Sequence, residues 1–565
     1  MNHRKEKLYM AKNTQTEFNS RKLFTYITKE KKDVASIYIY AILSGLVQLS
    51  IPLGIQAIVS YVMGATMVTS LYILIGFVVF GTFLAGFFRI RVMQIIEKIQ
   101  QKLFVEYSLA FAEKLPKTNL ATTKKYYLPE LVNRFFDVPN LQKGISKILL
   151  EIPTALIQIV FGIILLSFYH PWFLVFGALV FILVIVIFKF TSSSGIESSL
   201  KESDKKYEVA SWLEDIAGSV KTFKINSKSD THLKGTDNRV VSYLTHRTSH
   251  FKVLLLQYWT IVLFKVLITL LMLSIGTYLL INQELNIGAF VAAEIVVLTI
   301  LTAVEKLIKS LESYYDVITS LTKLSKVTEL PEENDSNIEI PDSKDGMEII
   351  FKDVSIHFND HKPIINNINF EIPENSLTVI KGYLGSGKSL LLNMMAGFYE
   401  PTNGTILFDK VPLSNINKAT FREQTGIYLE DMHIIKGTLL DNITLDKENY
   451  QTQDVLNLAE EWGIEDFSSQ FTQGLLTQLS DTDTELSFSS RKKILLLRAM
   501  LGNKRLLLLE DPVDGMDQDF AEKMTAYLKK IKSETTIVIV SENEELVNVA
   551  DHIFSVQNGS VIHIK

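Results

Sequence analysis

The chain has 565 residues, of which 47% are hydrophobic, and its mean hydropathy is +0.19 although 21% of the residues are charged. Its apolar residues must be concentrated in part of the chain, which is typical of a membrane protein. The formal net charge of -5 gives no overall basic field and argues against a nucleic-acid partner, and the absence of cysteine excludes disulfides, thiolate metal sites and cysteine nucleophiles.

The N-terminal arm, residues 1–33, is polar and charged, and it lacks an apolar stretch followed by a small-residue cleavage site. We therefore expect no cleaved signal peptide. Beyond the arm, six apolar segments reach the length of about 20 residues that a membrane helix needs. They are residues 34–61, 67–88, 152–169, 172–188, 254–281 and 287–304.

The connections between these segments alternate in length and charge. Residues 64–66, 170–171 and 282–286 are short and carry no Lys or Arg, whereas residues 89–147 and 189–252 are long and basic. Basic loops prefer the cytoplasmic side. The sequence thus predicts a multi-pass protein of the cell's inner membrane, surrounded by lipid, with both termini in the cytoplasm.

Apolar residues recur at helical spacing within the two long basic stretches, so we expect the membrane helices to continue into the cytoplasm. Residues 129–135 and 212–218 are candidate contacts for a cytoplasmic motor, or simply amphipathic helix packing. Two ionisable residues fall inside the spans. Lys265 is expected near the inner end of its helix, where its stem reaches the interface, whereas Glu294 either faces a transport pathway or is structural.

A linker rich in Pro, Glu, Asp, Asn and Ser covers residues 329–346 and separates two domains, 34–328 and 347–565. The predicted fold is an α-helical bundle of six membrane helices followed by an α/β P-loop NTPase domain. The second domain is expected on the cytoplasmic side, where ATP is available.

Residues 382–389 match the P-loop pattern G-x-x-x-x-G-K-[ST] between a predicted buried strand at 377–380 and a predicted helix at 390–395. The glycines let backbone N–H groups surround phosphate oxygens, Lys388 reaches the outer phosphates, and the Ser389 hydroxyl is placed for Mg²⁺. The alternative is a glycine-rich loop that only turns the chain. The residues expected to bind the nucleotide here are Gly382, Gly385, Ser386, Gly387, Lys388, Ser389 and Leu390.

From its first span to its C-terminus, the chain resembles a half-transporter of the ATP-binding cassette (ABC) exporters, of the type I secretion and peptide-export kind. Residues 486–490, Leu-Ser-Phe-Ser-Ser, stand where the family has its L-S-G-G-Q signature, and residues 506–512 are similar to its Walker B strand. Asp517 is similar to the D-loop aspartate. The resemblance implies that Phe358 stacks on adenine and that Ser487 approaches the nucleotide phosphate.

The cofactors implied are ATP and Mg²⁺, and several implied site residues depart from the family pattern. Glu430 replaces the Q-loop glutamine, Glu510 and Asp511 reverse the usual Asp-Glu order, and Glu542 takes the switch-histidine position. The resemblance gives these four carboxylates the catalytic positions and makes Ser389, Glu430 and Glu510 the metal ligands. We expect slow ATP hydrolysis, because the carboxylate of Asp511 is withdrawn and added negative charge opposes the phosphate. Alternatively, the extra carboxylates hold Mg²⁺ in a rewired site.

Phe488 and Ser489 replace signature glycines, which is expected to weaken closure of two cassettes around ATP. Since both halves of the composite site are altered, we favour a homodimer over a heterodimer with a regular partner. By analogy, the partners of a peptide or protein exporter are a periplasmic adaptor and an outer-membrane channel. A non-transporting ATP-sensing regulator or scaffold and a lipid or drug flippase are the alternatives.

Overall fold

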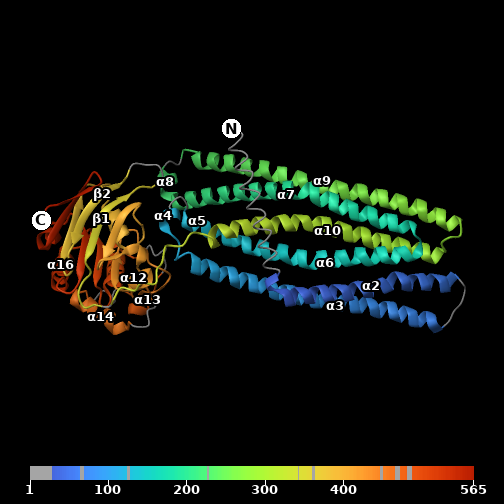
Figure 1. Cartoon of the computed structure of the whole chain (residues 1–565), viewed down its shortest axis with the longest axis horizontal. Coiled ribbons are helices and arrows are strands. Elements are labelled where there is room, and N and C mark those ends of the chain that lie inside the picture. Colours follow the sequence, from blue (N-terminus) through green and yellow to red (C-terminus); the bar gives the residue numbers. More distant parts are fainter. Residues whose placement is uncertain are drawn as a thin grey trace. The chain divides into compact units, whose positions relative to one another are not determined.

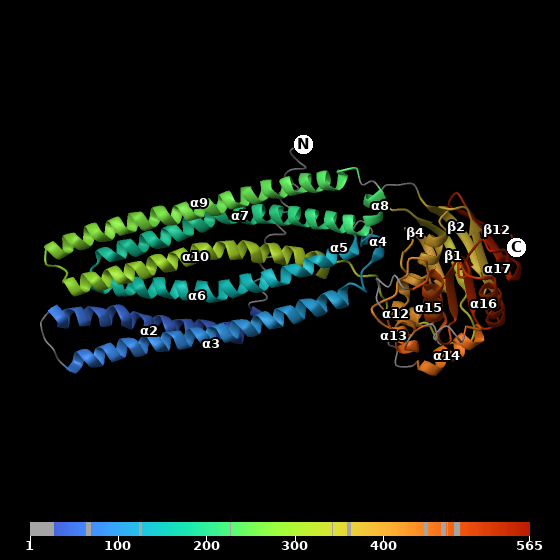
Figure 2. The same cartoon turned by 180° about the vertical axis from the view of Figure 1, so that it is seen from behind.

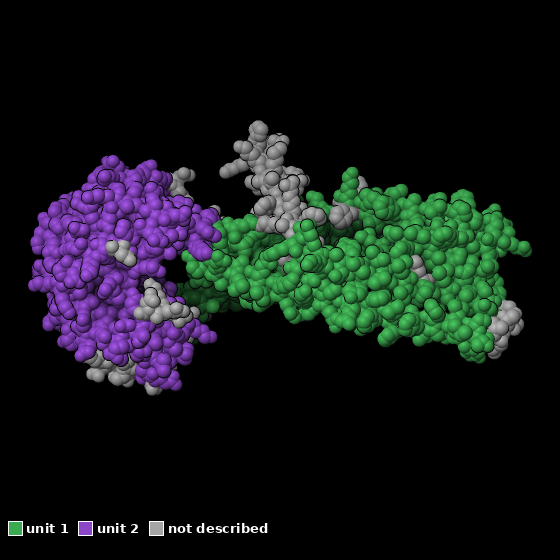
Figure 3. Space-filling view, turned by 60° about the horizontal axis from the view of Figure 1, so that its bottom comes forward, with its two compact units in different colours: residues 1–116, 126–330 green, residues 117–125, 331–565 purple. Residues whose placement is uncertain are grey.

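The computed structural model describes residues 28–63, 69–123, 127–225, 228–341, 343–358, 363–445, 450–464, 471, 473–479 and 486–565. The chain divides into two compact units (Figure 3). The first unit is Met1–Pro116 with Tyr126–Leu330, and the second is Lys117–Lys125 with Pro331–Lys565. Most of the predicted N-terminal arm and the loop at residues 64–66 lie outside the described residues.

Six helices of the described chain are long and apolar enough to cross a membrane, which confirms the predicted number of spans. They lie side by side over much of their length in Figures 1 and 2. Each helix contains all or nearly all of one predicted apolar segment and continues beyond that segment at one end or both. The long helices are α2 (Lys31–Met63), α3 (Thr69–Lys114), α6 (Val138–Tyr169), α7 (Trp172–Gly218), α9 (Thr231–Ile281) and α10 (Ile287–Thr328).

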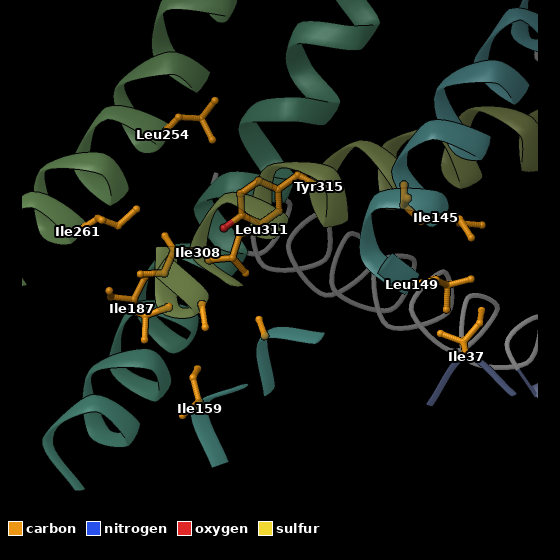
Figure 4. Packing of buried hydrophobic residues seen from close by; sticks show 14 of the residues in the cluster. Ile37, Ile145, Leu149, Ile159, Ile187, Leu254, Ile261, Ile308, Leu311 and Tyr315 are labelled. Atoms are coloured by element: carbon orange, nitrogen blue, oxygen red, sulfur yellow. The ribbon is translucent and has the colours of Figure 1, made fainter. Parts of the chain in front are cut away.

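The core of the first unit forms around α10, which packs against α6 more extensively than against any other helix. Figure 4 shows Leu311 and Tyr315 of α10 among apolar side chains from neighbouring helices. Tyr315 is fully buried, and its hydroxyl accepts a 2.8 Å hydrogen bond from Gln257 Nε2 of α9. The same nitrogen donates to Thr191 Oγ1 of α7 at 2.8 Å, so the polar groups in this part of the core have partners.

The two segments predicted as motor contacts pack within the first unit. Residues 129–135 fall in α5 (Leu128–Val132) and the 3-10 helix η1 (Asn133–Asp137), and the Phe135 ring packs edge-on against Phe111 at 5.7 Å. Trp212 near the end of α7 contacts Phe223 of α8 (Val220–Ile225). These contacts fit the helix-packing alternative, and contact of the two segments with a cytoplasmic motor stays a prediction.

A different segment of the N-terminal half, Lys117–Lys125, belongs to the second unit. It contains the short helix α4 (Leu120–Thr123). The Asn119 N–H donates a 2.9 Å hydrogen bond to Pro331 O, and the Glu333 N–H donates one to Lys117 O at 2.9 Å. Backbone pairing with the start of the predicted linker thus holds this segment in the second unit.

The two ionisable residues predicted inside the spans have different surroundings. Lys265 forms an ion pair with Glu305 of α10, so its charge is matched by a neighbouring helix. A cavity of about 210 Å³ lies between α2, α6 and α10, with Gln48, Gln158 and Thr299 among its lining residues. Glu294 is half-buried and is not among the residues that line this cavity, so its pathway role gains no support here.

The second unit is built on a six-stranded sheet in the order β12-β11-β3-β10-β9-β6. Strands β11, β3, β10, β9 and β6 run parallel, and their near-continuous apolar runs fit a sheet covered on both faces. The strands are β6 (Thr425–Tyr428), β9 (Leu506–Glu510), β10 (Thr536–Val540), β3 (Leu377–Gly382), β11 (His552–Gln557) and β12 (Ser560–His563).

A four-stranded antiparallel sheet, in the order β2-β1-β4-β5, accompanies the main sheet. Its strands are β1 (Ile349–Ile356), β2 (Ile365–Ile372), β4 (Asn403–Phe408) and β5 (Val411–Pro412), and a small pair joins β7 (Gly437–Thr438) to β8 (Gln478–Leu479). In the described part of this unit the helices, besides α4, are α11 (Lys388–Met395), α12 (Lys418–Glu423), α13 (Leu439–Thr444), α14 (Thr452–Glu461), α15 (Phe488–Met500), α16 (Gln518–Ile531) and α17 (Glu544–Val549), with 3-10 turns η2 (Leu413–Asn415) and η4 (Gly474–Leu476).

Because β3, β9 and β10 are parallel neighbours, their carboxyl ends meet at one edge of the sheet, where ligands bind in folds of this type.

Candidate nucleotide site

The P-loop connects the end of β3 to the start of α11, and the strand and helix predicted to flank it are confirmed. Gly387 has a φ of 104°, and a Cβ there would come within 2.8 Å of the Ile365 side chain. A Cβ on Gly382 would lie 2.4 Å from Val556 O, so both positions require glycine. The backbone can therefore approach a ligand as closely as a phosphate cradle needs.

Two side chains of the loop fit a phosphate group. Ser386 Oγ is buried and has no hydrogen-bond partner among the described residues, which leaves a polar atom available to a ligand. Lys388 Nζ donates to the backbone oxygens of Gly382 and Tyr383, the latter at 3.2 Å. Ser389 and Leu390 follow on the first turn of α11. The donor set is thus suited to ATP phosphates, with the Ser389 hydroxyl as one candidate Mg²⁺ ligand.

Glu542 contacts this loop, because it follows the end of β10, the strand that pairs with β3. Its Oε1 accepts a 2.8 Å hydrogen bond from the Gly382 N–H and lies 3.9 Å from Lys388 Nζ. Its Oε2 lies 3.8 Å from Lys381 Nζ. The carboxylate therefore occupies one backbone donor of the P-loop and reduces the positive charge that a phosphate would meet.

Four carboxyl groups, which we call the acidic cluster, lie around the ends of β6 and β9: Glu430, Glu510, Asp511 and Asp514. Glu510 is buried, and its Oε2 accepts a 3.1 Å hydrogen bond from the Glu430 N–H. Burial raises the pKa of Glu430, and the negative charges of Glu510 and Asp511 raise it further. The charges of Glu510 and Asp511 therefore make ionisation of Glu430 more costly.

Asp511 occupies a constrained position at the end of β9. Its φ is 43°, and its N–H donates a 2.8 Å hydrogen bond to Val540 O of β10. Burial raises the pKa of Asp511, against a hydrogen bond with Ser541 that lowers it. In the described part of the chain no group of three or more His, Asp or Glu side chains is arranged to hold a metal ion, so the Mg²⁺ set of Ser389, Glu430 and Glu510 stays a prediction.

The segment at the signature position begins α15. Ser487 caps this helix, because its Oγ accepts a 3.0 Å hydrogen bond from the Ser490 N–H. The Phe488 ring lies next to Gly515, and a Cβ on Gly515 would come within 2.7 Å of the ring. Phe488 thus fills the space beside the turn after β9, in a place where the family has a glycine.

Sequence reasoning missed Lys492, which lies one helical turn after Phe488. It is only 2% exposed, and its Nζ donates a 2.6 Å hydrogen bond to Asp514 O. Lys492 belongs to a run of three basic residues, 491–493, and such a run favours the interpretation that its side chains are exposed to water. The spacing of four residues from Phe488 is the signal that could have placed Lys492 on the same face of α15 as Phe488.

The candidate adenine-binding aromatic, Phe358, follows the end of β1. Phe358 is half-buried, and its ring packs edge-on against Tyr399, with 5.5 Å between ring centroids. The sequence did not single out Tyr399. Asp517 caps α16 by accepting a 2.8 Å hydrogen bond from the Phe520 N–H.

Comparison with known proteins places both halves of the chain. A family model described as the ABC transporter transmembrane region matches residues 34–304, and a model described as ABC transporter matches residues 365–514. The uncharacterized ABC transporter ATP-binding protein YknV of Bacillus subtilis (strain 168) is 27% identical over 223 residues, which are 40% of this chain and 37% of YknV.

The alpha-hemolysin translocation ATP-binding protein HlyB of Proteus vulgaris is 26% identical over 292 residues, 51% of this chain and 41% of HlyB. The chain therefore spans about two fifths of the length of these curated relatives. The solved structure of a bacterial Atm1-family ABC exporter with ATP bound covers 94% of each chain, with a TM-score of 0.80 and 17% sequence identity. This likeness shows the fold and confirms the predicted fold class.

Proposed function

Because the chain belongs to the ABC transporter family, we propose that it is an ATP-driven exporter that moves peptides or proteins out of the cytoplasm. The observation that carries the proposal is a P-loop with a fitting phosphate cradle in the same chain as six candidate membrane helices. The similarity to HlyB supports a peptide or protein as substrate. An ABC exporter works as a dimer in the membrane, and we propose a homodimer with a periplasmic adaptor and an outer-membrane channel as partners.

We further propose that hydrolysis is slow, with Asp511 as the general base. Glu542 supports this proposal, since it holds the Gly382 N–H and lies near Lys388, where it opposes an incoming phosphate. When bound, Mg²⁺ supplies charge neutralisation of the phosphates, and Ser389 with Glu430 or Glu510 would hold it. Lys388 and the backbone N–H groups of the loop orient the phosphates, while the half-buried carboxylate of Asp511 accepts a proton from water.

The export function is tested in cells that express either the full-length chain or its Lys388→Ala variant. We expect a defined set of peptides or proteins to be present outside cells with the wild-type chain and to accumulate inside cells with the variant. Identical secreted fractions would refute export. Movement of a fluorescent lipid by the purified protein in ATP-loaded vesicles would instead support a flippase, and ATP binding without turnover or transport would support a regulator.

The proposed orientation has both termini in the cytoplasm. An alkaline phosphatase fusion after Gly64 should be active, and one after Ser227 should be inactive, because this enzyme folds only outside the cytoplasm. Both fusion points lie outside the described residues, in predicted loops. The opposite pattern of activity would refute the orientation.

A further inference from the structure

Lys492 is a charged side chain enclosed by the second unit. It lies on α15, and the rings of Phe488 and Tyr428 flank its Nζ at 5.3 and 5.9 Å from their centroids. Its hydrogen bond to Asp514 O satisfies one of its three N–H donors. An ammonium group that is 2% exposed is stable only if nearby negative charge offsets the loss of water.

The acidic cluster supplies that charge. Burial lowers the pKa of Lys492, whereas Asp514, Glu430 and Asp511 act in the opposite direction and raise it. Lys492 in turn lowers the pKa of both Glu430 and Asp511. The fourth member, Glu510, acts on Glu430 and Asp511 as a further negative charge. The cation and the cluster therefore stabilise each other in their ionised forms.

Lys492 also fixes the backbone that carries Asp511. The Asp514 N–H donates a 3.3 Å hydrogen bond to Asp511 O, which closes the turn after β9. Asp514 then accepts from Lys492 through its own carbonyl oxygen, so the turn is tied to α15. Because Asp511 holds a positive φ, its backbone conformation needs such support from surrounding contacts.

We propose that Lys492 is a positioning residue of the ATP site, which anchors the turn bearing Asp511 to α15 through its hydrogen bond to Asp514 O. This inference rests on the proposed ATPase function. No hydrogen bond or ion pair of Lys492 in the described part of the chain involves the P-loop.

The first test is thermal unfolding of the full-length, nucleotide-free protein in lipid. The shorter side chain of Lys492→Gln cannot keep the hydrogen bond to Asp514 O that ties the turn after β9 to α15. Its apparent Tm should therefore fall by roughly 3 °C relative to wild type.

Lys493→Gln is the matched control, because Lys493 is the next residue of α15 and lies over the Phe520 ring. Its Tm should stay within about 1 °C of wild type. Lys492→Arg should recover part of the lost Tm, since a long cationic side chain can again donate to Asp514 O. Equal Tm values for Lys492→Gln and Lys493→Gln would overturn the anchoring role.

The second test separates positioning from nucleotide binding. Lys492→Gln should lower the kcat for ATP hydrolysis roughly tenfold or more, because Asp511 loses its orientation, and should leave ATP affinity by calorimetry within about twofold. Lys492→Arg should recover part of the kcat. Equal losses of kcat and affinity would contradict positioning. If the wild-type protein binds ATP without turnover, the ATPase proposal fails by itself, and the unfolding experiment still decides the role of Lys492.

Discussion

The P-loop and the acidic cluster lie at the same edge of one sheet, but they are built in different ways. The P-loop is a continuous segment whose glycines and flanking elements follow from local sequence, and its donors are backbone N–H groups, Lys388 and Ser389. The acidic cluster is assembled from the ends of β6 and β9 and the turn beyond β9, with Lys492 from α15 as its cation. We therefore expect nucleotide binding to depend on local geometry and turnover to depend on charge balance between distant segments.

The largest expected effect is on nucleotide binding through the P-loop. Lys388→Ala should weaken ATP affinity by roughly 100-fold, because a partly buried phosphate loses its charged partner. Calorimetry with the full-length protein in lipid measures this. Lys381→Ala is the matched control, since Lys381 lies at a similar distance from Glu542 but outside the loop, and it should change affinity far less. Equal effects of the two variants would refute the special role of Lys388.

The second prediction tests whether the residues that depart from the family pattern limit turnover as a unit. Asp511→Glu alone should gain little, because Phe488 still fills the space beside Gly515 and Glu542 still faces the P-loop. Combining it with Glu542→His and with glycine at Phe488 and Ser489 should raise kcat by more than the product of the single effects. Steady-state ATPase assays of the single and combined variants decide this. Purely multiplicative gains would show that the sites act independently.

A smaller effect is expected at Glu542, whose carboxylate contacts the P-loop. Glu542→Gln should tighten ATP binding by roughly two- to fivefold, since an exposed charge that opposes the phosphate is removed from beside Lys388. The gain is modest because the Glu542 side chain is 59% exposed and solvent screens it. Calorimetry at low and high salt should show the gain shrinking as salt increases. Glu544→Gln, two residues along the chain, is the control, and weaker binding by Glu542→Gln would contradict the assignment.

The smallest predicted change is a shift in the pH dependence of kcat. Asp511 acts as a base only when it is deprotonated, so hydrolysis should fall as pH drops through its raised pKa. Ser541→Ala removes a hydrogen bond that lowers this pKa and should move the acid limb to higher pH. Asp514→Asn removes a charge that raises it and should move the limb to lower pH. Shifts in the same direction would exclude Asp511 as the titrating group.

The residues that the sequence predicted and those that it missed differ in how far apart their contacts lie along the chain. The strand and helix that flank Gly382, Gly387 and Lys388 were predicted correctly because a P-loop is local: strand, turn and helix adjoin in the chain. Lys492 was missed because its burial depends on β6, β9 and the turn after β9, which are distant in sequence. In the first unit, the candidate contacts at residues 129–135 and 212–218 pack within that unit, whereas Lys117–Lys125 belongs to the second unit.

The sequence by itself determined the six membrane helices, the α/β nucleotide domain and the P-loop, because long apolar runs and glycine spacing act through local hydration and backbone geometry. Only the tertiary structure decided which charges face each other. It paired Lys265 with Glu305, placed Glu542 on the Gly382 N–H and enclosed Lys492 beside three carboxyl groups. The physical reason is that the energy of a charge depends on its burial and on neighbours from other elements, and neither is encoded in a local pattern.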